Sequence, residues 1–256
     1  MSIGERVLLA LSRKPGSQDF PKDDLTVDNA LDQLFEKYPD FRVLVSGKRV
    51  ADFGCGLGYQ SIALVKNCNC SVVGIDSNKK TLKKAAANAR VHQISSEVLS
   101  FVEHISLDML NSFDVVISKD SFEHFLDPGC VLNEMSRLLN DCGKIFVTFG
   151  PPWLAPYGSH MNFFCKVPWI NVLFSEETVM KTRRHFRSDG ANKYEEVESG
   201  LNKMTVAKFE SIVSSSKLKV TYMDYEYIFR FGWISKIPFL REFFIKHITV
   251  IFSNAT

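Results

Sequence analysis

The sequence predicts an α/β protein built on one doubly wound, mainly parallel sheet of seven strands. Short apolar segments alternate with helical segments from residue 48 to about 150, which is typical of a parallel sheet covered on both faces. A cluster of glycines, Gly54 to Gly58, directly follows the first apolar segment. The chain has 256 residues, of which 45% are hydrophobic. That is enough apolar material for one large core.

The chain begins with a segment, residues 1–47, that we expect to be a helical lid. Asp28 can cap a helix in which Leu31, Leu34 and Tyr38 recur at helical spacing. Strands are then expected at residues 48–53, 71–75, 98–104, 113–118, 144–149, 218–228 and 245–252. Helices are expected at residues 59–66, from a cap at Ser77 or Asn78 to 89, and at 129–140 and 205–215.

An insertion follows the fifth strand, because residues 151–203 hold prolines among aromatic residues and lose the alternating pattern. We therefore predict a single domain, residues 1–256, in four parts. They are the N-terminal helical segment (1–47), a cofactor-binding core (48–150), a substrate or cap insertion (151–203) and a C-terminal helix with strands (204–256).

Charge and composition exclude several classes of protein. With 31 Lys and Arg against 29 Asp and Glu, the chain should not hold nucleic acid by bulk charge. The most apolar stretch, residues 229–252, contains five charged side chains, too many for a lipid-facing helix. A signal peptide is not expected at residues 1–11. The six cysteines lack metal spacing, so we expect reduced, buried thiols, no bound metal and a cytoplasmic location.

The glycine cluster lies where a nucleoside-containing cofactor binds in doubly wound sheets. Glycine lets the backbone turn sharply after a strand and approach a ligand closely. The helix that follows presents N–H groups to it. Asp76 ends the next strand, 22 residues after Gly54, and can accept hydrogen bonds from both hydroxyls of a ribose. A solvated helix cap is the alternative reading of Asp76.

The spacing of this cluster argues against a dinucleotide cofactor. The sequence fingerprint of dinucleotide-binding proteins, G-x-G-x-x-G, requires glycine at position 59, where this chain has Tyr59. Asp52 precedes the first glycine by two residues. Its carboxylate would repel a pyrophosphate but attract an amino or sulfonium group. The residues therefore favour a cationic ligand.

These residues resemble the class I S-adenosylmethionine-dependent methyltransferases. Val50 to Gly58 is similar to the first motif of that family, Asp76 to its ribose-binding acid, and Phe113 to Ser118 to its fourth strand. The resemblance covers residues 48–150. It implies S-adenosyl-L-methionine as cofactor and S-adenosyl-L-homocysteine as product. It also implies cofactor-binding roles for the following residues: Asp52, Gly54, Cys55, Gly56, Gly58, Asp76, Ser77, Asp108, Met109 and Lys119.

Within that set, the resemblance assigns each residue to a different part of the cofactor. Asp52 and the Gly54–Gly58 backbone would hold the amino-acid end, and Asp76 the ribose. Asp108 and Met109, after the third strand, would lie near the adenine. For Asp108 an ordinary turn aspartate is the competing interpretation.

Two histidines are the candidates for general base. His160 follows the fifth strand, at the edge where ligands bind in open α/β sheets, and histidine can titrate near neutrality. A structural histidine bonded to a loop carbonyl is an equally good reading. His124 is the second candidate, although related methyltransferases often carry a histidine there that is not catalytic. Asp120 and Glu123 flank the expected pocket and could orient an amine or hydroxyl.

The aromatic residues are unevenly distributed: 12 of 31 lie in residues 1–150 and 19 in residues 151–256. Residues 1–150 have a net charge of −2 and residues 151–256 of +4. Since the family varies its acceptor site in this later part, we expect a small-molecule acceptor with an apolar or ring face, and the basic excess leaves room for an anionic group on it. Trp153, Tyr157 and Trp169 are the candidate substrate contacts.

Residues 233–247 alternate aromatic and basic side chains, so a peripheral membrane contact stays open beside a pocket wall or a dimer contact. The oligomeric state is not predicted.

The function predicted from the sequence is methyl transfer from S-adenosylmethionine to a small molecule, at oxygen. Gly150-Pro151-Pro152-Trp153 is similar to a motif of nucleobase and glutamine N-methyltransferases, but it follows the fifth strand instead of the fourth. We therefore exclude that chemistry. A catalytically silent binding module and a nicotinamide-dependent oxidoreductase remain as alternatives.

Overall fold

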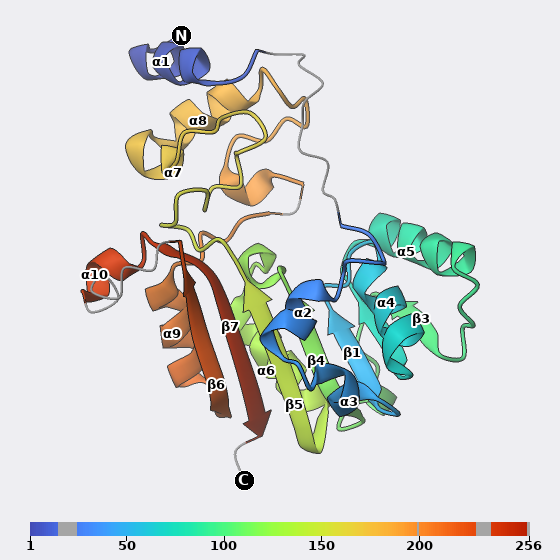
Figure 1. Cartoon of the computed structure of the whole chain (residues 1–256). Helices are drawn as coiled ribbons and strands as arrows, with labels where there is room; N and C mark the ends of the chain where they lie inside the picture. Colours follow the sequence, from blue (N-terminus) through green and yellow to red (C-terminus); the bar gives the residue numbers. More distant parts are fainter. Residues whose placement is uncertain (15–24, 199, 229–236, 255–256) are drawn as a thin grey trace.

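The computed structural model describes residues 1–14, 25–198, 200–228 and 237–254. Its centre is a seven-stranded sheet in the order β3-β2-β1-β4-β5-β7-β6 (Figure 1). The strands are β1 Arg49–Phe53, β2 Ser71–Ile75, β3 Leu99–Val102, β4 Phe113–Lys119, β5 Leu139–Phe149, β6 Leu218–Tyr227 and β7 Ile245–Asn254. The predicted fold class is confirmed.

Strand directions divide the sheet into two parts. The neighbours β3, β2, β1, β4 and β5 are parallel, whereas β7 runs antiparallel to both β5 and β6. Because β2 and β4 lie on opposite sides of β1, the strand order reverses there. In doubly wound sheets, ligands bind in the crevice outside the carboxyl ends of the strands at such a point.

Helices cover both faces of the sheet. Buried residues of four helices pack on one face: α2 Asp32–Lys37, α3 Phe41–Val45, α4 Tyr59–Cys68 and α5 Lys79–Val91. The other face is covered by α6 Pro128–Leu138 and α9 Val206–Ser215. The predicted cap of α5 is present, because the Asn78 side chain accepts from the backbone N–H of Lys80 and Thr81. The side chain of Thr205 caps α9 by accepting from the backbone N–H of Lys208. Asp28 is not a cap: α2 begins only at Asp32, and Leu31 precedes it without a capping side chain.

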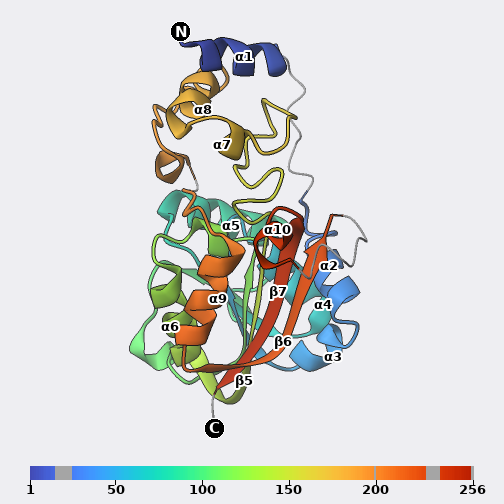
Figure 2. The same cartoon turned by 90° about the vertical axis from the view of Figure 1, so that its left-hand side faces the viewer.

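Residues 1–14, 151–198 and 200–203 form a separate layer, here called the cap, beyond the carboxyl ends of the parallel strands (Figures 1 and 2). It contains α1 Ile3–Leu11, α7 Ile170–Leu173 and α8 Glu176–Arg183. The cap has its own apolar core, in which Leu8 of α1 meets Phe164, Met180 and Tyr194 of the insertion. Within the described residues of the N-terminal segment, α1 joins the insertion, whereas α2 and α3 pack on the sheet.

The aromatic residues of the insertion largely build this core. Phe164 and Phe186 stack with ring centroids 5.0 Å apart, and Trp153 packs edge-on against Tyr194 at 4.8 Å. Aromatic pairs of this kind contribute about 0.5–1.5 kcal/mol beyond the area that they bury. A layer detached from the main core needs such large side chains, which accounts for part of the aromatic excess in residues 151–256.

Several further predictions are answered by the described residues. Cys55, Cys68, Cys70 and Cys165 are buried free thiols, whereas Cys130 in the first turn of α6 and Cys142 near the start of β5 are exposed. Trp233 lies outside the described residues. From residue 237 to 247 the chain forms a short helix, α10 Pro238–Arg241, and the start of β7.

Within the described ranges no helix is long and apolar enough to cross a membrane.

Candidate active site

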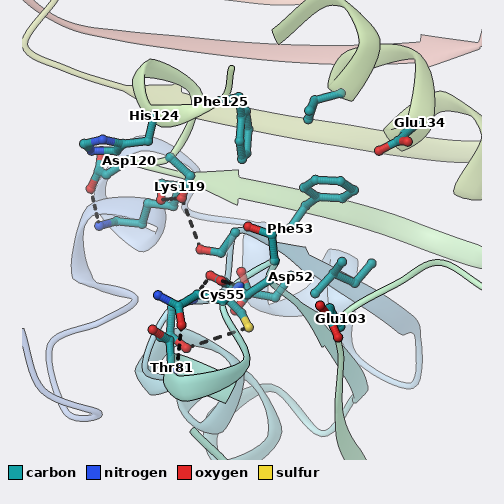
Figure 3. A pocket seen from close by; sticks show the side chains of 18 of the residues that line it. Asp52, Phe53, Cys55, Thr81, Glu103, Lys119, Asp120, His124, Phe125 and Glu134 are labelled. Carbon is teal, nitrogen blue, oxygen red and sulfur yellow. Dashed lines mark hydrogen bonds and ion pairs between the residues drawn. The ribbon is translucent and has the colours of Figure 1, made fainter. Parts of the chain in front are cut away.

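A cavity of about 1630 Å³ opens at the carboxyl ends of β1, β2 and β4, beneath the cap (Figure 3). Lys119, Asp120 and His124 lie at one end of it, and Glu103 and Glu134 at the other. Nine of the residues predicted to bind cofactor or to act in catalysis line this one cavity: Asp52, Gly54, Cys55, Gly56, Asp76, Ser77, Lys119, His124 and His160.

The glycine loop is clamped between the first two strands. The backbone N–H groups of Gly54 and Cys55 both donate to the carbonyl of Ile75, over 2.8 and 3.1 Å. Gly54 has φ +81°, and a Cβ there would lie 2.7 Å from Ser121 Cβ, so no other residue fits. Gly56, with φ +52°, has no atom within 4 Å of the place of a Cβ. A ligand can therefore approach its backbone directly.

Asp76 connects this loop to the next helix. Its Oδ2 accepts from the backbone N–H of Gly56 at 3.0 Å, and its Oδ1 accepts from that of Asn78 at 2.8 Å. Each carboxylate oxygen has a second lone pair left for a ligand. Asp76 thus shapes the loop and offers two acceptors to a diol, and the loop and carboxylate together fit the ribose of an adenosyl cofactor.

Asp52 lies deeper, with 2% of its surface exposed. The Gln60 side-chain amide and the Ser61 hydroxyl donate to its two oxygens, over 2.8 and 2.5 Å. Burial raises the pKa of Asp52 to about 6, although these two hydrogen bonds oppose the shift. A cation placed beside this carboxyl would stabilise its charged form, which suits an ammonium group.

At the end of β4, polar side chains of β4, β7 and α2 are linked by ion pairs and hydrogen bonds. The Lys119 ammonium lies 2.7 Å from Asp120 Oδ2, and His247 Nε2 of β7 lies 3.0 Å from Asp120 Oδ1. The Gln33 amide of α2 lies 3.1 Å from the same His247 nitrogen. Burial alone would raise the pKa of Asp120. The hydrogen bond with His247 and the charge of Lys119 outweigh burial and hold this pKa below its usual range. The ion pair with Asp120 thereby holds the Lys119 side chain at the cavity wall.

The two candidate bases lie together, their ring centroids 5.5 Å apart. His124 Nδ1 lies 2.6 Å from the carbonyl oxygen of Gly200. The His160 ring is hydrogen-bonded to the Pro151 carbonyl, and its Nε2 is buried without a partner among the described residues. The proton therefore sits on Nδ1. Burial, followed by the neighbouring His124, lowers the pKa of His160 to about 4.

Glu123 is a cavity residue that the sequence placed only as a flanking group. It is 3% exposed, and its Oε2 is buried without a partner in the described part of the chain. Burial, reinforced by Asp120, raises the pKa of Glu123 to about 8. The only sequence signal was its place in the acidic segment after β4.

The structure does not bring all predicted site residues to the cavity. Gly58 begins α4 with φ +77°, Asp108 is exposed outside, and Met109 is buried in the main core. After β3, the residues that line the cavity are Glu103, His104, Ile105, Ser106, Leu107 and Leu110. Asp108 and Met109 belong to the short 3₁₀ turn Leu107–Met109 and do not line it.

The three candidate substrate contacts also lie away from it. Trp153 packs on Tyr194, Tyr157 is 42% exposed, and the Trp169 indole N–H donates to the Leu154 carbonyl. The aromatic residues that line the cavity are Phe53, Tyr59 and Phe125. In the described ranges no group of three or more His, Cys, Asp or Glu is arranged to hold a metal ion.

A doubly wound sheet with this strand order, a glycine loop after β1 and an acid after β2 define a class I S-adenosylmethionine-dependent methyltransferase domain. Residues 44–151 match a family described as a methyltransferase domain. The matched segment holds β1 to β5, the glycine loop and Asp76, and thus most of the cavity wall. The chain carries a domain of this family.

The curated relatives are methyltransferases by name. The chain is 35% identical over 114 residues to a ubiquinone biosynthesis O-methyltransferase of Pseudomonas aeruginosa, covering 43% of this chain and 47% of that protein. It is 30% identical over 144 residues to the protein of the same name from Xanthomonas oryzae, covering 54% and 57%. The chain thus spans about half the length of the curated relatives it matches.

Solved structures share the fold over nearly the whole chain. A methyltransferase from Mesorhizobium loti has a TM-score of 0.55 at 16% identity, covering 84% of this chain and 96% of that one. The [4+2]-cyclase SpnF has a TM-score of 0.58 at 14% identity, covering 92% and 85%. At these identities the likeness concerns the fold. A nicotinamide-dependent oxidoreductase, left open by the sequence, has no support among these relatives.

Proposed function

We propose that this chain transfers a methyl group from S-adenosyl-L-methionine to a hydroxyl of a small molecule. The observation that carries the proposal is one cavity holding both the Asp76-clamped glycine loop and the unpaired Nε2 of His160. The name O-methyltransferase, borne by the curated relatives, supports oxygen as the acceptor atom.

The bound cofactor would supply an activated methyl group, so the protein's task is to position the acceptor and to remove its proton. Asp76 would accept the ribose hydroxyls. Asp52 would face the amino group, and Lys119 would neutralise the carboxylate of the amino-acid end. His160 would take the hydroxyl proton, because its buried ring is neutral at pH 7 and Nε2 is free to accept.

Two measurements test the proposal. Calorimetry with S-adenosyl-L-homocysteine tests cofactor binding, and mass spectrometry tests transfer of a deuterated methyl group to a panel of phenols, hydroxy acids and amines. We expect binding, and transfer to hydroxyl compounds. No binding by the wild-type protein would refute the proposal.

A silent binding module is the alternative that the same experiment separates. It would bind the cofactor and give no labelled product with any acceptor of the panel. Asp141→Asn, at an exposed position outside the cavity, is the matched control for the cavity variants described below.

A further inference from the structure

Glu123 is a buried carboxyl that the steps above do not use. It lies in the short helix Phe122–His124 after β4, is 3% exposed and lines the cavity. Its Oε2 is buried and has no hydrogen-bond partner within the described ranges. A buried polar atom without a partner destabilises the folded protein. Its position beside the cavity is explained if a ligand supplies the missing partner.

The backbone places Glu123 next to the proposed base. The Glu123 carboxyl accepts a hydrogen bond from the backbone N–H of Gly150, and the His160 ring donates to the carbonyl of Pro151. Two adjacent residues at the end of β5 thus hold both groups. Each group keeps one buried unpaired atom, Oε2 and Nε2 respectively. A single small molecule can therefore meet both.

We propose that Glu123 is a hydrogen-bond donor to the methyl acceptor: as a neutral acid it binds a second oxygen of the acceptor and so selects oxygen compounds over amines. This contact rests on the function proposed above. The acceptor class is a molecule with two oxygens, one methylated beside His160 and one, such as a phenolate, carbonyl or carboxylate oxygen, held by Glu123.

The protonation state of Glu123 decides which ligands it can hold. Burial, with the Asp120 carboxylate adding to it, raises the pKa of Glu123 to about 8, so that the neutral acid predominates at pH 7. A neutral acid donates one hydrogen bond to an oxygen but offers no charge to an ammonium. The other titratable or charged groups around it are Lys119, Asp120, His124, His160 and His247.

The transfer step is balanced without Glu123 changing its protonation. The acceptor oxygen forms its bond to the methyl carbon as the bond between that carbon and sulfur breaks, and the electron pair of that bond remains on sulfur. The hydroxyl proton goes to Nε2 of His160. Glu123 keeps its own proton throughout, so its role is to bind and orient the acceptor.

The test uses 4-nitrocatechol, a coloured monoanion between pH 7.5 and pH 9.5 whose binding can be followed by absorbance. Its affinity is measured for the protein saturated with S-adenosyl-L-homocysteine, as wild type, Glu123→Gln and Glu123→Leu. Glu97→Gln is the matched control, since Glu97 is exposed and lies outside the cavity. Melting temperatures confirm that each variant is folded.

For the wild type and the control we expect the affinity to fall more than about tenfold from pH 7.5 to pH 9.5, as the Glu123 proton is lost. His160 stays neutral over this range, because its pKa lies near 4. Glu123→Gln, whose amide donates at every pH, should stay within about twofold. Glu123→Leu should bind at least about tenfold more weakly than wild type at pH 7.5.

The proposal is overturned if Glu123→Gln keeps the pH dependence of the wild type. It is also overturned if Glu123→Leu binds the probe as tightly as the wild type, or if the wild type does not bind the probe. If Glu123→Leu does not fold, the pH profile of Glu123→Gln alone decides. If the protein binds the homocysteine product and methylates an amine but not a phenol, the donor role of Glu123 fails while methyl transfer stands. Failure to bind that product overturns both.

Discussion

Asp76→Asn should weaken both the glycine loop and the cofactor site, because the two oxygens of Asp76 accept from the backbone N–H groups of Gly56 and Asn78. An asparagine has only one acceptor oxygen, so its NH₂ group must face one of these donors. Losing one hydrogen bond to a charged group costs about 1.5–3 kcal/mol. That corresponds to a factor of about 10 to 150 in an equilibrium constant.

The assay is calorimetric titration with S-adenosyl-L-homocysteine, beside thermal unfolding of the free protein. We expect affinity to fall about 10- to 150-fold and the melting temperature to fall about 3–12 °C, at about 2–4 °C per kcal/mol for a chain of this size. Asp141→Asn should change neither. Affinity within threefold of wild type in Asp76→Asn would show that this carboxylate does not hold the ribose.

Two further substitutions and one labelling experiment have defined outcomes. His160→Ala should lower turnover about 10²- to 10⁴-fold and leave the affinity for S-adenosyl-L-homocysteine within about twofold; an unchanged rate would make the ring structural. Asp52 keeps its proton in the folded state up to about pH 6, so its contribution to stability is present below pH 4 and is lost as the pH rises through 6. Asp52→Asn should therefore lose less stability than wild type between pH 4.5 and pH 7, by up to about 2 kcal/mol in denaturant titrations; equal slopes would contradict this. Ellman's reagent should label two thiols of the native protein rapidly, Cys130 and Cys142, and fast labelling of four or more would contradict the structure.

The parallel half of the fold could be predicted because its signals are local. Short apolar strands are separated by helices with their own start signals, such as the Asn78 side chain that accepts two backbone N–H groups. The start of α2 could not be predicted in this way. There the chain forms turns up to Leu31, and Leu34 of the helix is buried in a cluster with residues of α4, β4 and β5, which lie far along the chain.

The cofactor half of the site was also predictable, since Asp52, Gly54 and Asp76 follow strands whose carboxyl ends meet at one edge. The position of Asp108 was not, because sequence spacing after β3 does not reveal the 3₁₀ turn Leu107–Met109, in which Asp108 does not line the cavity. The positions of the candidate substrate contacts could not be predicted for a similar reason. Whether Trp153 lines a pocket or fills a core depends on how the insertion folds back on α1, which no local pattern encodes.

The position of β7 has a consequence for how the protein is made. This strand is the last element of the described chain, yet it is flanked by β5 and β6 and pairs with both. During synthesis, β5 and β6 therefore emerge with open hydrogen-bonding edges that nothing earlier in the chain covers. Unpaired edges of this kind invite pairing with other chains. A nascent polypeptide that stalls before Ile245 would thus be aggregation-prone, because the ten-residue strand β7 is the one that pairs with both of these edges.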